Sequence, residues 1–393
     1  MYSSLWICVG LMVLLASCAA QQSPPQTQYP PVDKLPQRAE LPDPFRFEDG
    51  SRVKTPQDWP RRREELVKLI LYYEYGRVPP PPGNVKGTVV SETQSVFLGA
   101  TVKTILLEMG PADHKITSRV ELTIPNGPGP WPVIIRGDLC WGRVDGDILA
   151  DASRRGYAVA DFDRTDFAPD SRDRSKGVYP VYPDYDCAAP AAWAWGFARV
   201  VDYLYDQPWV DRQKIIVTGH SRGGKGSQLA GALDTRVALT NPNDSGCGGA
   251  GCYRLQAPKS EDIVAITKNF PFWFSTRFPS FIGHIDQLPF DQHSVKALVA
   301  PRAYLSTEAL GDLWANPQGT QQSHLAAKEV WDFLGAPDRT AIYFREGKHE
   351  HTRADWNILM DFADKVLKGK PVETKFNNYA FPTEPKPYSW TKP

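Results

Sequence analysis

The strongest chemical signal in the sequence is a serine flanked by glycines at residues 219–223, Gly-His-Ser-Arg-Gly. This run fits the pattern Gly-x-Ser-x-Gly, in which a nucleophilic serine lies on a sharp turn between a strand and a helix. A short apolar segment, residues 214–218, comes before it, and residues 224–233 follow as an expected helix. Glycine permits both the tight turn and a close approach of neighbouring backbone. The pattern therefore predicts that Ser221 is a nucleophile; an ordinary strand–helix turn is the simpler alternative.

Two cationic residues follow this serine, Arg222 and Lys225. They are three positions apart and so share one face of the expected helix. Positive charge in the first turn of a helix opposes the helix dipole, at a cost of ~0.3–1 kcal/mol for each residue. Solvated side chains would tolerate that cost. We favour the interpretation that both cations face a group that carries, or develops, negative charge beside Ser221.

A nucleophilic serine also needs a base and an acid. His349 and His351 are the two histidines that directly follow the last expected strand, residues 340–344. We favour His349, which ends the loop after that strand, because His351 already leads into the next helix. Asp312 and Asp244 each follow an earlier strand, and either carboxylate could orient the histidine. The alternative is an aspartate that caps its own loop. The sequence favours Asp312 slightly and leaves the choice open.

The elements around these residues alternate between strand and helix. After antiparallel patterns in residues 85–125, short apolar runs of parallel-strand type recur at 132–136, 157–162, 214–218, 237–240, 303–306 and 340–344. Helical patterns lie between or after them at 147–154, 191–206, 224–233, 322–333 and 356–367. This order predicts an α/β fold of the α/β-hydrolase kind, a doubly wound, mostly parallel sheet with helices on both faces. Ligands of such sheets bind at the carboxyl ends of the strands, where the candidate residues lie.

The bulk composition narrows the classes of function. Lys and Arg together number 45, as do Asp and Glu, so the net charge is zero and nothing favours nucleic acid as a partner. The histidines and cysteines show no metal-ligand spacing, so we expect neither a metal nor a cofactor. No internal repeat or second change of composition interrupts residues 46–393. We expect one catalytic domain there, and a monomer.

The first residues look like a targeting segment. Residues 5–15 are almost wholly apolar but too short to span a bilayer. The run Leu-Ala-Ser-Cys ending at Cys18 resembles a bacterial lipobox, which predicts a signal peptide over residues 1–18 and a lipid on Cys18. A plain signal peptide ending near Ala20 is the alternative. Residues 19–45, rich in Pro and Gln, are expected to form a linker. Both alternatives place the protein outside the cytoplasm, attached to a membrane only through the lipid or secreted.

Several motifs together resemble the glucuronoyl esterases of carbohydrate esterase family 15. The motifs are Gly-His-Ser-Arg-Gly-Gly-Lys-Gly (219–226), Trp-Ala-Trp-Gly (193–196), Asn-Asp-Ser-Gly-Cys-Gly-Gly (243–249), Asp-Gln-His (291–293), Asp-Leu-Trp-Ala-Asn-Pro (312–317) and Gly-Lys-His (347–349). The resemblance extends over residues 46–370. It implies cleavage of the ester between 4-O-methyl-glucuronic acid of glucuronoxylan and lignin alcohols.

The resemblance also implies roles for single residues. Ser221 resembles the nucleophile, His349 the base and Arg222 the arginine that stabilises the oxyanion. Lys225, Glu261 and Trp314 resemble residues that contact the sugar. Asp244 occupies the acid position of fungal members and Asp312 that of many bacterial ones, so the acid stays open. His220 stands where fungal members carry a disulfide-bonded cysteine.

Two other functions compete with this one. The first is an acetyl- or feruloyl-type xylan esterase of the same fold, which would have no reason to gather cations beside the nucleophile. The second is an inactive carbohydrate-binding lipoprotein, which would have no need of a serine, a histidine and an acid in this order.

Overall fold

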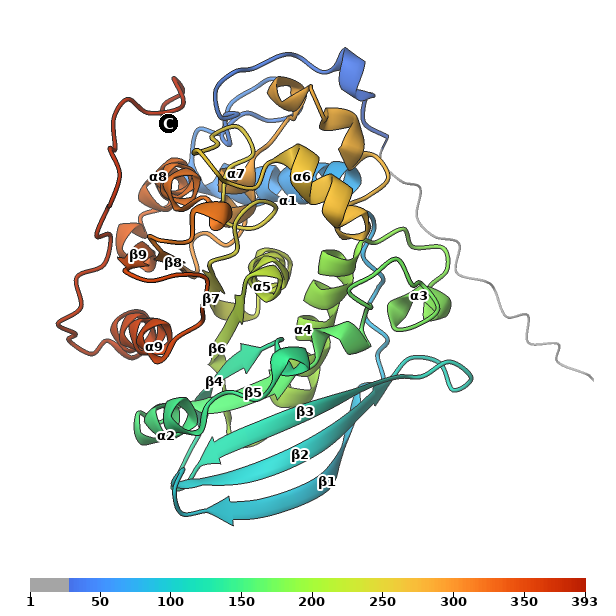
Figure 1. The fold of residues 1–393 in the computed structure, drawn as a ribbon, viewed down its shortest axis with the longest axis vertical. Helices are drawn as coiled ribbons and strands as arrows, with labels where there is room; N and C mark the ends of the chain where they lie inside the picture. The colour runs from blue at the N-terminus through green and yellow to red at the C-terminus, as the bar shows by residue number, and fades with distance from the viewer. Residues whose placement is uncertain (1–27) are drawn as a thin grey trace, which may run out of the picture.

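The structure is a computed structural model that describes residues 28–393, and across these residues one nine-stranded sheet forms its centre (Figure 1). The strands lie in the order β1-β2-β3-β5-β4-β6-β7-β8-β9. Their bounds are β1 Lys86–Ser95, β2 Ala100–Met109, β3 Ile116–Pro125, β4 Trp131–Arg136, β5 Ala158–Phe162, β6 Val210–His220, β7 Val237–Asn243, β8 Ala303–Ala309 and β9 Thr340–Arg345. The α-helices are α1 Trp59–Ile70, α2 Gly146–Arg154, α3 Val178–Val181, α4 Ala189–Tyr205, α5 Arg222–Leu233, α6 Ile263–Asn269, α7 Gln292–Ala297, α8 Pro317–Phe333 and α9 Arg353–Lys368.

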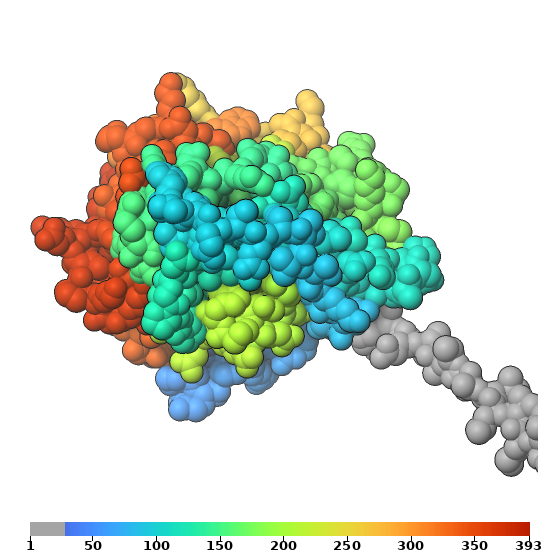
Figure 2. Space-filling view, turned by 90° about the horizontal axis from the view of Figure 1, so that it is seen from below, coloured from blue at the N-terminus to red at the C-terminus, as the bar shows by residue number. Residues whose placement is uncertain are grey.

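The pairing of the strands confirms the predicted mixed sheet. Three neighbouring pairs are antiparallel: β1–β2, β2–β3 and β3–β5. The other five pairs are parallel: β5–β4, β4–β6, β6–β7, β7–β8 and β8–β9. Strands β1–β3 form an antiparallel wing that lies across the face shown in Figure 2. Nearly every residue of the outermost strand, β1, is exposed. Residues 132–135 of β4, in contrast, are all buried, because a parallel strand is covered on both faces.

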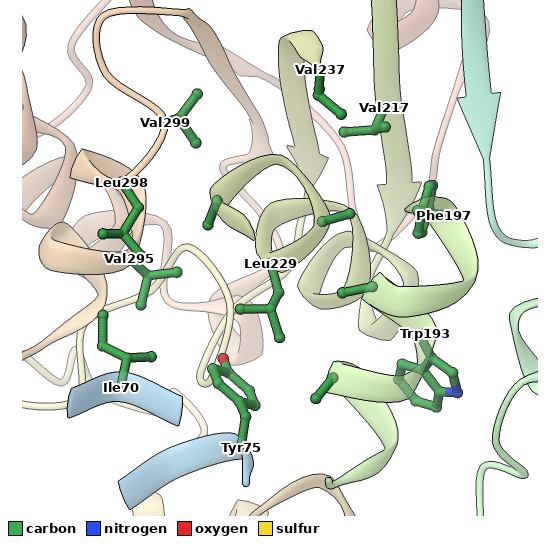
Figure 3. Close-up of a cluster of buried hydrophobic side chains, with 14 of the residues drawn as sticks. Ile70, Tyr75, Trp193, Phe197, Val217, Leu229, Val237, Val295, Leu298 and Val299 are labelled. Atoms are coloured by element: carbon green, nitrogen blue, oxygen red, sulfur yellow. The ribbon is translucent and has the colours of Figure 1, made fainter. Parts of the chain in front are cut away.

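Helices cover both faces of the sheet, as the sequence predicts. Figure 1 shows α2 and α9 on one side and α4 and α5 on the other. Leu229 of α5 lies at the centre of the larger core, among side chains of α1, α4, α7 and the sheet (Figure 3). Many residues of α5 are glycine or alanine, which lets this helix pack close to the strands on either side of Ser221. The core therefore holds α5, the helix that follows the predicted nucleophile Ser221, against the sheet.

The segment before the predicted domain boundary does not behave as a linker throughout. Leu41 and Phe45 are buried, and Phe45 packs against the rings of Trp59, Phe333 and Trp390. The backbone N–H of Leu41 donates to the carbonyl of Pro387, 3.0 Å away. The domain boundary predicted at residue 46 is therefore too late. The sequence did not reveal this, because the apolar side chains that anchor the segment have no regular spacing. The predicted signal peptide, Cys18 and residues 19–27 of the predicted linker lie outside the described residues.

Helix α8 begins five residues earlier than the pattern predicts. Pro317 occupies its first turn, where a missing N–H costs nothing, and the side chain of Asn316 accepts a hydrogen bond from Gly319 N at 2.9 Å. The short helices α3, α6 and α7 were not predicted. Within residues 28–393, no helix combines the length and the apolar character needed to cross a membrane. The cysteines of this part of the chain, Cys140, Cys187, Cys247 and Cys252, are free thiols.

Candidate active site

Ser221 occupies a strained turn between β6 and α5. Its φ of 54° and ψ of −120° lie in a region that residues other than glycine rarely adopt. Backbone strain of this kind is common at functional sites. A Cβ on Gly219 would lie 2.4 Å from the carbonyl oxygen of Gly223, and one on Gly223 would lie 1.8 Å from Oδ1 of Asp138. The turn therefore requires both glycines, as the Gly-x-Ser-x-Gly pattern predicts.

A buried ion pair supports this turn from below. Asp138, in the loop after β4, accepts hydrogen bonds from the backbone N–H of His220 at 2.8 Å and from Arg164 Nη1 at 2.6 Å. Neither side chain of the pair is exposed. Removing Asp138 would leave the charge of Arg164 buried and uncompensated. Asp138 therefore fixes the backbone next to Ser221.

The predicted base and one of the two predicted acids meet directly. His349 Nδ1 lies 2.5 Å from Asp312 Oδ2, and the histidine side chain is 43% exposed, so its other ring nitrogen remains accessible. The loops after β8 and β9 are joined by a hydrogen bond from Gly311 N to the carbonyl of Gly347, 2.9 Å long. Asp312 Oδ1 accepts a bond from Ala315 N at 3.3 Å. These contacts hold the carboxylate against Nδ1 of the imidazole.

Asp244, the other predicted acid, is held by different partners. Its Oδ1 accepts from the backbone N–H of Ala309 at 2.6 Å, and its Oδ2 lies 3.4 Å from Arg345 Nη2. Burial raises the pKa of this carboxyl to about 7. Asp244 thus lies close to the histidine without bonding to it.

His351, the less favoured histidine, is half-buried and packs against two rings. Its ring lies 5.4 Å from Trp356 and 6.0 Å from His220, centroid to centroid, and burial lowers its pKa well below the usual range. His220 in turn lies 4.4 Å from the ring of His349, and its Nδ1 is 2.7 Å from Asn243 Oδ1. His220 therefore contacts the predicted base, although the Gly-x-Ser-x-Gly pattern alone does not single it out.

Arg222 extends from the first position of α5 toward an acidic partner. Its Nη1 donates to Asp170 Oδ2 at 2.7 Å, and its guanidinium carbon lies 5.0 Å from the ring centre of Phe270 and 5.1 Å from that of Trp273. The Nε atom is buried and has no hydrogen-bond partner among the described residues. One N–H of this cation therefore remains to be satisfied beside Ser221.

The ammonium group of Lys225 is bonded to backbone carbonyls of the loop after β7. Its Nζ lies 2.5 Å from the carbonyl oxygens of both Ser245 and Cys247. These bonds offset the cost of a cation near the helix N-terminus and leave one of three donors for a ligand. Burial lowers the pKa of the ammonium, whereas the carboxylate of Glu261 acts in the opposite direction.

Glu261 presents an unpartnered oxygen to the same region. The side chain is buried, and its Oε1 has no hydrogen-bond partner among the described residues. Burial raises its pKa, and the charge of Lys225 acts against that shift. An orphaned buried acceptor beside a cation is suited to a ligand hydroxyl.

These residues surround one cleft of about 160 Å³. Its wall is formed by Ser221, Arg222, Lys225, Asp244, Ser245, Gly246, Glu261, Phe270, Trp273, Trp314, Ala315 and His349. Trp314 is 52% exposed and so stands at the rim. Seven of the eight predicted site residues line this cleft, and the eighth, Asp312, lies behind His349.

Asp244, Asp312 and His349 are the one set of potential metal ligands among residues 28–393 whose donor atoms all lie within 4.8 Å of one another. Asp312 and His349 bond to each other, and Asp244 bonds to Ala309 and Arg345. Protein partners thus occupy these donors, and we propose no metal here.

Comparisons with known proteins give the family. A family model described as "Glucuronyl esterase, fungi" matches residues 108–335. The 4-O-methyl-glucuronoyl methylesterase of Phanerochaete carnosa is 35% identical over 353 residues, which cover 85% of this chain and 82% of that protein. The chain belongs to the glucuronoyl esterases of carbohydrate esterase family 15.

Solved structures agree with this assignment. A glucuronoyl esterase of carbohydrate esterase family 15 from Caldicellulosiruptor kristjansonii superposes with a TM-score of 0.78 at 34% identity, over 90% of this chain and 97% of the other. The glucuronoyl esterase of Sporotrichum thermophile, solved as a serine-to-alanine mutant in complex with methyl 4-O-methyl-β-D-glucopyranuronate, gives 0.72 at 27% identity, over 86% and 90%. The predicted resemblance and the α/β-hydrolase fold are confirmed.

Sequence reasoning missed some residues of this glucuronoyl esterase site. Arg222 is surrounded by Asp170, Phe270 and Trp273, none of which directly follows a strand of the sheet. The density of aromatic residues at 270–274, Phe-Pro-Phe-Trp-Phe, was a signal that could have drawn attention to two of them. Nothing in the local sequence marks Asp170.

Proposed function

We propose that this protein is a serine esterase that cleaves the ester between 4-O-methyl-glucuronic acid of glucuronoxylan and lignin alcohols through an acyl-enzyme. The observation that carries the proposal is the content of one cleft: Ser221 on its strained turn, His349 bonded to Asp312, and Arg222 and Lys225 beside them. The family supports the same reaction, since the Phanerochaete carnosa relative is named a 4-O-methyl-glucuronoyl methylesterase.

In the proposed reaction, Ser221 Oγ attacks the ester carbonyl while His349 takes its proton. Asp312 accepts the Nδ1–H bond, which leaves Nε2 free as the base and stabilises the imidazolium that forms. Arg222 stabilises the negative charge that develops on the carbonyl oxygen. His349 then returns the proton to the departing alcohol. A water molecule, activated by the same histidine, hydrolyses the acyl-enzyme and releases the uronic acid.

The substrate follows from the polar groups around the serine. The remaining donor of Lys225 and the unpartnered oxygen of Glu261 can bond to hydroxyls of a uronate ring. Trp314 at the rim offers an exposed indole face to the sugar. The Sporotrichum thermophile relative was solved with a methyl ester of this sugar, which supports the same class of ligand.

The competing functions are not favoured. An acetyl ester has no ring to engage Lys225 and Glu261, and the matched relatives are glucuronoyl esterases. An inactive binding protein would have no need of the bond between His349 and Asp312.

We also propose that the protein is exported and acts as a monomer. The support for export is the apolar run at residues 5–15 and the cysteine at position 18, which would carry a lipid. A neutral net charge gives no reason for a nucleic-acid partner.

The proposal is tested by assaying the purified protein on three esters: benzyl glucuronate, phenyl acetate and methyl ferulate. We expect kcat/KM on the uronate ester to exceed that on the other two at least tenfold, which requires only about 1.4 kcal/mol of differential binding. Faster turnover of the acetyl or the feruloyl ester would assign the protein to the competing class of esterase. No turnover of any ester would favour the binding protein.

A further inference from the structure

Arg222 is anchored at only one edge of its guanidinium. Its Nη1 is bonded to Asp170 Oδ2 at 2.7 Å, while its Nε is buried without a partner among the described residues. The two side chains are 30% and 17% exposed, so water screens the pair only in part. An arginine that stabilises a developing oxyanion must already point in the right direction before the charge appears. The anchor at Nη1 leaves the other N–H groups of Arg222 as the ones to meet that charge.

Asp170 is itself held by a second donor. Its other oxygen, Oδ1, accepts a hydrogen bond from the indole Nε1 of Trp273 at 2.8 Å. Trp273 is buried and stacks on Phe270, with 3.9 Å between ring centres and 8° between ring planes. The guanidinium of Arg222 lies over both rings. One carboxylate thus joins the cation to the aromatic pair against which it packs.

The parts of this arrangement come from separate regions of the chain. Asp170 lies in the loop after the short helical turn at residues 164–166, and Trp273 lies 103 residues further on, in the segment after α6. Arg222 belongs to neither region. Their convergence at one guanidinium is therefore a product of the tertiary fold, and a loss of Asp170 would release Arg222 and Trp273 together.

We propose that Asp170 is a positioning residue that fixes the Arg222 guanidinium at the ester carbonyl, with Trp273 fixing Asp170. The inference rests on the proposed function, because Arg222 acts there on the oxyanion. Charge alone makes the opposite prediction, since an anion beside Arg222 weakens the field that the oxyanion feels. The direction of the effect of removing Asp170 therefore separates positioning from simple electrostatics.

The test is a double-mutant cycle of Asp170→Ala and Arg222→Ala, measured on benzyl glucuronate and on phenyl acetate. Losing one oxyanion donor costs about 10²–10³ in kcat, so we expect Asp170→Ala to lower kcat at least tenfold with a smaller change in KM. In the Arg222→Ala background the same substitution should change kcat less than about twofold. Trp273→Phe keeps an aromatic ring but loses the bond to Asp170, and should lower kcat in the same direction by less.

The matched control is Asp173→Ala, which removes an exposed carboxylate from the same loop and should leave kcat unchanged. Circular dichroism and the melting temperature establish that each variant is folded. An unchanged or higher kcat for Asp170→Ala, or an equal fold-loss in the Arg222→Ala background, would overturn the proposal. If only phenyl acetate is hydrolysed, the proposed substrate is wrong, while the cycle on that ester still decides the role of Asp170.

Discussion

Ser221, the proposed nucleophile, stands at the start of α5 with a strained backbone. Its positive φ lifts the side chain out of the end of β6, and the next residue, Arg222, supplies a cation to the same cleft. The proposed base, His349, and the proposed acid, Asp312, lie in the loops after β9 and β8. Because the loops that carry these residues follow parallel strands, the order of the strands brings the side chains to the same edge of the sheet.

Between the two candidate acids, the structure leads to an asymmetric prediction. Asp312→Asn should lower kcat by about 10³–10⁴, because an amide in place of the carboxylate favours the wrong tautomer of His349. Asp244→Asn should cost far less, because the main partners of Asp244 are Ala309 N and Arg345. Steady-state kinetics on benzyl glucuronate measure both. A larger loss at Asp244 would make that residue the acid.

Single residues also show where sequence reasoning stops. The order of serine, acid and histidine along the chain singled out Ser221, Asp312 and His349, because each comes after a strand, whereas Glu261 and Trp314 were predicted only from the family resemblance. The anchor of Arg222, Asp170, had no such mark, and the bonds that hold Lys225 are made by backbone carbonyls, which every residue carries. They come from loops whose paths depend on packing across the whole fold.

The turn between β6 and α5 that carries Ser221, here called the elbow, is the element on which the site depends. The glycines in this turn and in the helix after it do not tolerate substitution equally. A Cβ on Gly223 would collide with Asp138, whereas one on Gly226, one helical turn later, would lie at an ordinary 3.4 Å from Trp193 Cβ. We expect Gly223→Ala to destabilise the fold by about 3 kcal/mol or more, since it must displace a buried carboxylate that pairs with Arg164.

Gly226→Ala is the matched control, and it should leave stability unchanged or raise it by up to about 1 kcal/mol, because alanine favours a helix interior. Urea denaturation measures both variants. Equal effects of the two substitutions would show that the contact between Gly223 and Asp138 does not restrict the elbow.

A second element carries a buried acid outside the cleft. Leu71–Tyr75 continues α1 as a π-helical turn, and its Glu74 accepts bonds from Tyr253 at 2.6 Å and Gln292 at 3.0 Å. Burial raises the pKa of Glu74 from 4.5 to about 8. Between these two pH values the folded protein keeps a proton that the unfolded chain has released. This contribution to stability is therefore complete below pH 4.5 and is lost as pH rises to about 8.

Glu74→Gln isolates that contribution, because glutamine keeps an acceptor for Tyr253 and does not titrate. The melting temperature of the variant relative to wild type should therefore rise, by a few degrees, between pH 5 and pH 8. Thermal denaturation at several pH values measures the difference. A difference that stays constant over this range would contradict the assignment of a buried, protonated Glu74.

At the scale of the whole molecule, the pattern of strands and helices predicted the sheet, its mixed pairing and the helices on both faces. The repeating polarity of each element carries that information. It did not predict that residues 28–45 belong to the domain, because Leu41 and Phe45 are spaced without a period in a stretch rich in proline. Composition alone cannot distinguish a segment that packs on the domain from a linker.

Removing residues 28–45 should destabilise the domain. A chain without residues 1–45 loses the burial of Leu41 and Phe45, each worth about 1.5–3 kcal/mol, relative to a chain without residues 1–27. The comparison is made by the midpoint of urea denaturation, which should fall for the shorter chain. Equal midpoints would show that the packing of these residues contributes nothing to stability.

The central claim is that Ser221 hydrolyses a uronate ester, and it is tested most directly by comparing wild type with Ser221→Ala on methyl 4-O-methyl-glucuronate. The account predicts turnover by wild type and a loss in kcat of about 10⁴–10⁶ in the variant, because the proposed acyl-enzyme forms on Ser221 Oγ. The melting temperature of the variant should not fall. Retention of more than a few per cent of wild-type activity would contradict the account and place the nucleophile elsewhere.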